Sequence, residues 1–130
     1  MNRKLRAYFD QQLESVLAQM PDRVHELLEE VTMYVEDHPS PEVLRRTGVR
    51  RRHNLCGLYT GIPLTLKQIE ASGVLSDAIY LYREGILSLA GNDSGEIRED
   101  ELRRQIRITI LHELGHYHGL NERELRELGY

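Results

Sequence analysis

Three side chains late in the chain have the types and the spacing that chemistry on a metal ion requires. His112 and His116 are four residues apart, and on an α-helix such residues project from the same face, so both imidazoles can bind one ion. Glu113 lies about 100° further round that helix. From there it can accept a proton from a water on the ion but is turned away from direct ligation. The segment therefore predicts two metal ligands and a general base.

A third ligand is expected because catalytic zinc normally takes three protein ligands and leaves one position for water. Gly119 can adopt the left-handed conformation that ends a helix and turns the chain back. Glu122, three residues later, is then the predicted third ligand. An alternative role stays open, because Asn121 can cap a closing helix with Glu124 as its capping-box partner. Glu122 would then only favour the dipole at that helix start.

Other polar residues near the motif carry weaker predictions. His118 is rotated away from His112 and is expected to be a packing or surface residue. Gln105 and Thr109 lie on the His112 face, where they can support the ligands or simply meet water. Tyr117 is a candidate for stabilising an oxyanion, although packing in the core is its simpler role.

The elements that must position these residues can be predicted from the spacing of apolar side chains. In the first part of the chain the apolar residues recur at three and four, which is typical of amphipathic helices. A β-branched and aromatic run then indicates a strand. Ser40 and Pro41 can begin a short helix that ends at Gly48. The expected elements here are helices over 2–20, 22–30 and 41–48 and a strand over 31–35.

The second half of the chain is expected to hold two paired strands and the long helix that carries the motif. The strands are predicted over 55–64 and 78–89, with a turn at 71–73 between them. After a break at 91–95, Asp93 or Ser94 can cap a helix that runs from about 96 to 118. That helix is apolar nearly all round, so it should be buried.

These elements indicate an α+β protein, with a small mixed sheet, a buried helix bearing the motif and a short C-terminal helix. A length of 130 residues suits one domain over 1–130. The formal net charge is −4, which offers no general attraction to nucleic acid or to anionic lipid. The run Arg45, Arg46, Arg50, Arg51 and Arg52 is the exception: it is either a solvated face or a site for an acidic substrate or RNA.

Cysteine usage and the start of the chain limit the remaining classes. Cys56 is the only cysteine, which excludes an intramolecular disulfide and zinc sites built from several thiolates. Any metal must therefore be held by histidine and carboxylate. No stretch resembles a signal peptide and none approaches transmembrane length, so a cytoplasmic location is the default expectation.

The segment from His112 to Glu122 resembles the zincin superfamily in its extended form, histidine-glutamate-x-x-histidine-x-x-glycine-x-x-acid. More closely, the chain looks like the minimal zincin-like metallopeptidases, a bacterial family of about this length. The resemblance implies a compact zincin-like domain and zinc-dependent hydrolysis of a peptide or protein substrate. It also implies that His112, His116 and Glu122 bind zinc and that Glu113 is the catalytic base.

Two other functions are consistent with the same residues. A zinc-stabilised binding module would use the metal for folding and leave the peptidase machinery silent, and it would show an occluded site with closed coordination. A metal-dependent ribonuclease is supported only by the arginine run. An intact Glu113 favours hydrolysis of peptides over both, because structural zinc needs no base beside it. The oligomeric state, the cleavage specificity and any oxyanion-stabilising residue are left open by the sequence.

Overall fold

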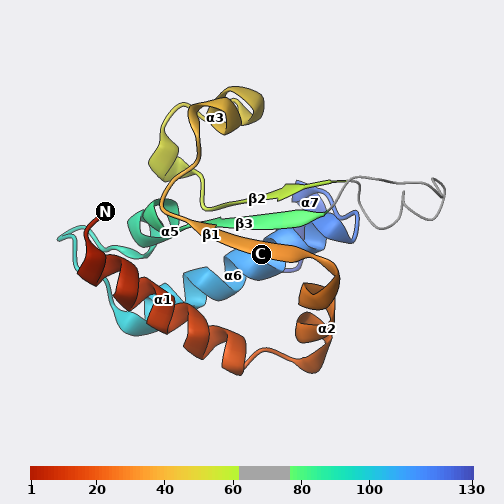
Figure 1. Ribbon diagram of the computed structural model, residues 1–130, viewed down its shortest axis with the longest axis horizontal. Helices are drawn as coiled ribbons and strands as arrows, with labels where there is room; N and C mark the ends of the chain where they lie inside the picture. The colour runs from red at the N-terminus through yellow and green to blue at the C-terminus, as the bar shows by residue number, and fades with distance from the viewer. Residues whose placement is uncertain (62–76) are drawn as a thin grey trace.

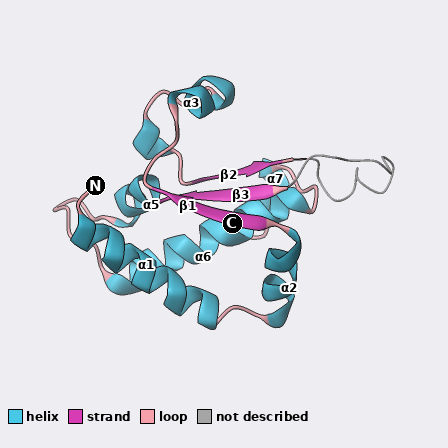
Figure 2. Cartoon of the chain, viewed as in Figure 1, coloured by secondary structure: helices cyan, strands magenta, loops and turns pink. Residues whose placement is uncertain are grey.

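The protein was analysed as a computed structural model, which describes residues 1–61 and 77–130. It is a small α+β structure with a three-stranded sheet, as the sequence predicts (Figures 1 and 2). None of its described helices is long and apolar enough to cross a membrane. In chain order the elements are α1 (Arg3–Ala18), α2 (Asp22–Glu30), β1 (Thr32–Glu36), α3 (Pro41–Thr47), the 3-10 turn η1 (Arg52–Asn54), β2 (Gly57–Thr60), β3 (Ala78–Tyr82), α5 (Arg83–Ala90), α6 (Glu99–Tyr117) and α7 (Glu122–Glu127).

The sheet has the order β1-β3-β2, with β3 parallel to β1 and antiparallel to β2. The strand predicted to begin at residue 78 is therefore the internal strand of the described sheet. Since β3 is paired on both sides, Ile79 and Leu81 are fully buried, as is typical of an internal strand. Among the described strands, β2 is the edge that lies over α6, and no described strand pairs with its outer side.

Helix α6 packs across one face of this sheet, and α1 lies against α6 (Figure 1). Phe9 of α1, Leu81 of β3 and Ile106 and Ile110 of α6 are all fully buried in one apolar cluster. The expected burial of the motif-bearing helix is thus confirmed for its core-facing residues. This packing fixes α6 rigidly beneath the sheet, which in turn fixes whatever side chains α6 presents toward β2.

Local signals placed the early elements correctly. Asn2 caps α1 through its side chain, and Ser40 caps α3 with Pro41 at the first helical position. Gly48 ends α3 in the left-handed conformation, with φ of 76°. The strand predicted over 55–64 is confirmed at Gly57–Thr60 and pairs with the next strand. Its residues 62–64 and the turn at 71–73 lie outside the described residues.

Two predicted boundaries are wrong. Residues 83–89 form helix α5 instead of extending β3; Ile86, Leu87 and Ala90 are buried with helical spacing, which the apolar run conceals. The motif-bearing helix begins at Glu99 with Arg98 at its cap position, and neither Asp93 nor Ser94 caps it. The reason is that Asn92 accepts hydrogen bonds from the backbone of Ser94 and Glu96, which holds that segment in a turn.

Candidate metal centre

Three side chains from α6 and α7 converge on one point. The Nε2 atoms of His112 and His116 are 3.2 Å apart. Oε1 of Glu122 lies 2.8 Å from Nε2 of His116 and 3.2 Å from Nε2 of His112. The ligand atoms of a tetrahedral zinc ion lie about 3.3 Å from one another, given zinc–ligand bonds of about 2.0–2.1 Å. The three atoms therefore form one triangular face of a zinc coordination sphere without rearrangement.

The hydrogen bonding of His116 shows which atom is free to bind a metal. Its Nδ1 lies 2.9 Å from the backbone carbonyl of Leu120, and a carbonyl can only accept a hydrogen bond, so Nδ1 carries the proton. In the neutral ring Nε2 then presents a lone pair toward Glu122 Oε1. Two lone pairs at such a distance repel each other unless a cation or a proton lies between them. This arrangement, with a carbonyl holding the tautomer of the histidine, is typical of metal-binding histidines.

Glu122 is the first residue of α7, and its carboxylate faces the two histidines. Asn121 caps α7, and its side chain and that of Glu124 form a complete capping box. The capping role weighed against ligation thus belongs to Asn121 and Glu124, and it leaves the Glu122 carboxylate free to face the histidines. Burial acts to raise the pKa of Glu122, but its hydrogen bonds and charge interactions with His116 and His112 together outweigh this and bring the pKa below its ordinary value.

Two glycines let α7 return to the end of α6. Gly119 has φ of 86°, the left-handed conformation predicted for it. That turn places the Leu120 carbonyl against His116 and the start of α7 beside the histidines. Gly115, inside the motif, lies under α7: a Cβ atom at Gly115 would collide with the side chain of Leu125, which is fully buried. The absence of a side chain at Gly115 is thus what allows α7 to dock.

Glu113 points toward β2 and is only 6% exposed. Burial raises its pKa to about 8, the charge of Glu122 adds to the rise, and a hydrogen bond from the Tyr59 backbone opposes it. Gly57 lies directly above this carboxylate, because a Cβ atom built there would approach Cγ of Glu113 to 3.1 Å and the Tyr80 carbonyl to 2.9 Å. Glu113 is therefore held between α6 and the edge strand, beside the three converging atoms.

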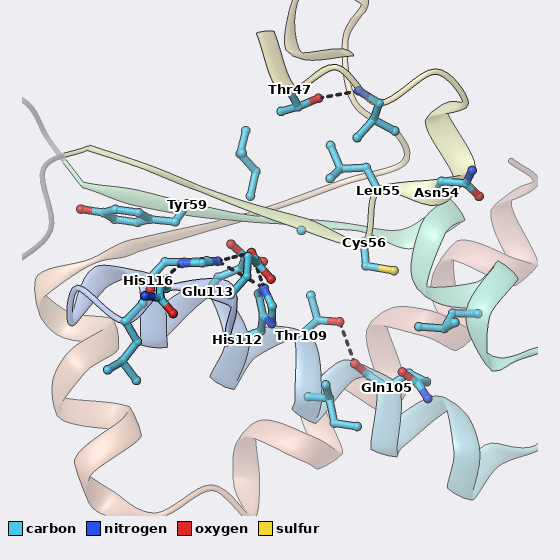
Figure 3. Close-up of a pocket in the computed structure, with 18 of the residues that line it drawn as sticks. Thr47, Asn54, Leu55, Cys56, Tyr59, Gln105, Thr109, His112, Glu113 and His116 are labelled. Atoms are coloured by element: carbon cyan, nitrogen blue, oxygen red, sulfur yellow. Dashed lines mark hydrogen bonds and ion pairs between the residues drawn. The ribbon is translucent and has the colours of Figure 1, made fainter. Parts of the chain in front are cut away.

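The cluster opens into a cleft of about 710 Å³ between β2, α6 and the segment before β2 (Figure 3). His112 and His116 each expose 23% of their side chains, and Glu122 exposes 64%. Apolar residues, among them Leu58 and Ile108, line much of the cleft wall. The cluster is thus accessible to solvent and to a ligand that enters along β2.

The other residues considered near the motif do not belong to the converging group. Gln105 and Thr109 line the cleft, but their side chains bond to Glu101 and to the backbone of α6, and no described contact joins them to the histidines. Tyr117 is buried against Tyr59. His118 stands outside the converging group. Burial raises the pKa of the Cys56 thiol to about 11, so this cleft residue stays protonated at neutral pH.

Sequence reasoning missed the contribution of the edge strand. Neither the role of Gly57 above Glu113 nor that of the Leu120 carbonyl was predicted. The signal for Leu120 was present, because a carbonyl that follows a predicted left-handed turn can reach back to the second histidine. No local signal exists for Gly57, since its closeness to α6 depends on the pairing of β2 with β3.

The structure is thus a small α+β protein in which a buried helix bears two of the three residues of a candidate metal site. The sequence model of the zincin-like metallopeptidase family matches residues 28–130, and the chain belongs to this family. The match begins within α2 and spans the sheet, α6 and α7. A comparison with curated proteins finds no match. Family membership implies a metal, typically zinc, and the class of metallopeptidases, in agreement with the resemblance seen in the sequence.

Proposed function

We propose that this protein is a zinc-dependent peptidase in which His112, His116 and Glu122 hold the metal and Glu113 is the general base. The observation that carries the proposal is the convergence of three ligand atoms, 2.8–3.2 Å apart, at the floor of an open cleft beside a buried carboxylate. The donor set fits zinc, because two imidazoles and one carboxylate are the ligands of several catalytic zinc sites.

When bound, zinc supplies Lewis acidity: it polarises a carbonyl and lowers the pKa of water in its coordination sphere. The Glu113 carboxylate takes the proton of the attacking water and returns it to the amine that leaves as the peptide bond breaks. Its burial favours the neutral acid, which suits the second of these transfers. The opposing hydrogen bond from the Tyr59 backbone keeps the carboxylate oriented toward the cluster.

The open edge of β2 is suited to hold the substrate in an extended conformation. The Tyr82 backbone N–H donates to the Cys56 carbonyl, and hydrogen-bonded pairs alternate along an antiparallel ladder. The main-chain groups of Gly57 and Tyr59 therefore point to the open side of β2, next to the cluster. The Tyr59 N–H is donated to Glu113, so a peptide laid along this edge can pair with the N–H and C=O of Gly57 and with the C=O of Tyr59 as an added strand. This pairing would bring one of its carbonyls over the floor of the cleft.

The exposure of the site favours catalysis over a silent, zinc-stabilised module. A structural zinc site is closed by four protein ligands, whereas only three candidate ligands converge here among the described residues. The fourth side faces the cleft, where a water and a substrate can enter. A purely structural site would also gain nothing from the costly burial of Glu113 beside it.

The test is cleavage of a peptide library by the zinc-loaded protein and by its Glu113→Gln variant. Glutamine keeps the shape of the side chain but cannot accept the proton, so cleavage should fall by about 10²–10⁴-fold while one zinc per chain stays bound. Glu29→Gln, which removes an exposed acid from α2, is the matched control and should cleave like the wild type. Undiminished cleavage by Glu113→Gln would remove the base assignment. A zinc-loaded wild type that cleaves no peptide would overturn the proposed activity.

A further inference from the structure

An arginine-rich segment adjoins the cleft. We call residues 41–54, which comprise α3, η1 and their connection, the arginine segment. It carries five arginines and one acidic residue, Glu42, hence a formal charge of +4 in a chain whose net charge is −4. The remainder of the protein is thus strongly acidic. A cationic segment on an acidic body produces a local field that attracts anions to one place on the surface.

Most of these arginines pair with nothing in the part of the chain that the structure describes. Arg52 pairs with Glu84 at 2.9 Å. Arg45, Arg46, Arg50 and Arg51 are exposed and form no ion pair with any residue in 1–61 or 77–130. The arginine segment also buries no side chain of α3 or η1. It therefore adds little to the core, and its cations are available to an external anion.

The arginine segment is nevertheless held at a fixed place. The Arg52–Glu84 pair joins η1 to α5. Gly85 allows the backbone at Leu55, directly after η1, to lie against α5, because a Cβ atom at Gly85 would collide with the Leu55 carbonyl. Gly48 caps α3 and defines its end. The cations thus stand in a set position relative to the start of β2 and to the cleft below it.

The cleft runs from the candidate metal site to this segment without interruption. Its floor holds His112 and Glu113, its wall is β2, and its far end is lined by Asn54 and Val49 (Figure 3). Val49 directly precedes Arg50 and Arg51 in the chain. A peptide that lies along β2 with its scissile bond over the candidate metal site therefore extends, on one side of that bond, toward the arginine segment.

We propose that the preferred substrates are peptides that carry acidic side chains on the side of the scissile bond that lies over the arginine segment. This inference rests on the proposed peptidase function. Guanidinium groups bind carboxylates through paired hydrogen bonds, and the acidic body disfavours the same peptide elsewhere on the surface. RNA fits less well, because the segment contains no Phe, Tyr or Trp on which a base could stack.

The experiment uses the zinc-loaded full chain and pairs of peptides that differ only in charge. Around one cleavage site, Glu and Asp are compared with Gln and Asn at two to four residues from the scissile bond, first on one side and then on the other. For the wild type at low salt we expect kcat/KM of the acidic peptide to be about tenfold higher than that of the neutral peptide when the acidic residues lie on one side of the scissile bond. When they lie on the other side, the two values should be equal. The factor is modest because two exposed ion pairs contribute little. Salt at 0.5 M should reduce this ratio.

Charge reversal tests whether the arginine segment causes the preference. In an Arg50→Glu/Arg51→Glu variant the ratio should fall to about one or below. Arg3→Glu/Lys4→Glu, on the exposed start of α1, makes the same change in net charge away from the cleft and should keep the wild-type ratio. Because the neutral peptide is measured in each variant, it reports on the metal site independently of the charge effect.

Several results would overturn the inference. One is a wild-type ratio near one on both sides, and another is an unchanged ratio in Arg50→Glu/Arg51→Glu; in both cases the peptidase itself stands. Salt-sensitive binding of a single-stranded RNA oligonucleotide that Arg50→Glu/Arg51→Glu abolishes, with the peptide ratio unchanged, would assign the segment to RNA instead. No cleavage of any peptide, acidic or neutral, would remove the proposed function and this inference together.

Discussion

Two clusters of ionisable side chains stand out in this structure, and they differ in charge balance. In the first, Arg83 bonds to Asp10 and to Asp37, and Arg6 also bonds to Asp37. We call these four residues the anchor cluster; it joins α1 to the ends of β1 and β3. Its two cations and two anions neutralise each other. The second, which we call the metal cluster, consists of His112, Glu113, His116 and Glu122.

The metal cluster has two acidic side chains and two imidazoles, and no described lysine or arginine forms an ion pair with it. It therefore has no fixed cation like those of the anchor cluster, and a bound dication would supply positive charge. Arg83 in the anchor cluster exposes only 11% of its side chain and has two anionic partners. A buried charge is tolerated where its partners are present. An acidic cluster beside a cleft without balancing cations is thus suited to bind a cation, whereas a balanced cluster such as the anchor cluster holds the fold together.

The largest effect should come from breaking the metal cluster at a ligand. His112→Ala leaves two of the three ligand atoms, so we expect zinc per chain to fall from about one to near zero in metal analysis after dialysis, with loss of all zinc-dependent cleavage. His118→Ala is the control, since His118 lies outside the converging group. Retention of zinc by His112→Ala would show that the ligand assignment is wrong.

Zinc removal should lower the free energy of unfolding of the protein but leave the anchor cluster intact. If zinc binds only the folded state, saturation at 100–1,000 times its dissociation constant adds about 3–4 kcal/mol to the free energy of unfolding. Thermal or denaturant unfolding with zinc and with a chelator measures this. Glu122→Gln should reduce the difference in unfolding free energy between the zinc-loaded and the chelator-treated protein, because it removes one anionic ligand. An unfolding curve that zinc does not move would contradict a metal site at this position.

Gly115→Ala should weaken zinc binding without touching a ligand. The added methyl group collides with Leu125, which would push α7 and with it Glu122 away from the histidines. Overpacking of this kind costs about 1–3 kcal/mol, and we expect zinc affinity to fall about tenfold or more. Competition with a chromogenic chelator measures the affinity. A wild-type affinity in Gly115→Ala would show that the docking of α7 does not position the third ligand. Gly91→Ala is the control, because Gly91 has φ of −72° and a Cβ atom there would meet only ordinary van der Waals contacts.

The smallest effect should come from the anchor cluster. Hydrogen bonds from Arg6, assisted by those from Arg83, bring the pKa of Asp37 from 3.8 to about 2. A lowered pKa in the folded state stabilises the fold above pH 4, and this contribution is lost as the pH falls from about 4 to 2. Asp37→Asn should therefore cost about 1 kcal/mol at pH 7 after allowance for solvent screening, and the difference from wild type should vanish near pH 2.

Urea unfolding of Asp37→Asn between pH 2 and 7 measures this difference, with Asp93→Asn, an exposed acid in a turn, as the control. Zinc content and cleavage at pH 7 should stay at the wild-type level. A loss of zinc from Asp37→Asn would show that the two clusters are coupled, contrary to the separation drawn above.

The sequence predicted the site better than it predicted the fold around it, because the site depends on local spacing. Helical periodicity alone places His112 beside His116, and a left-handed glycine at 119 brings Glu122 to them. The apolar run after residue 82 satisfied both strand and helix patterns, so α5 was misassigned. The central place of β3 and the cover that Gly57 gives to Glu113 arise from pairing between strands distant in the chain, and local residue types do not encode such contacts.

The construction of α3 has a consequence for protein engineering. Its start is set by Ser40 and Pro41, its end by Gly48, and it buries no side chain. The helix can thus be exchanged as a cassette between two local stop signals, with no compensating change in the core. Variants with different loops grafted over residues 41–51 would share the cleft floor on α6 and differ at its far end, so the proposed peptidase would serve as a scaffold in which substrate selection is varied separately from the metal site.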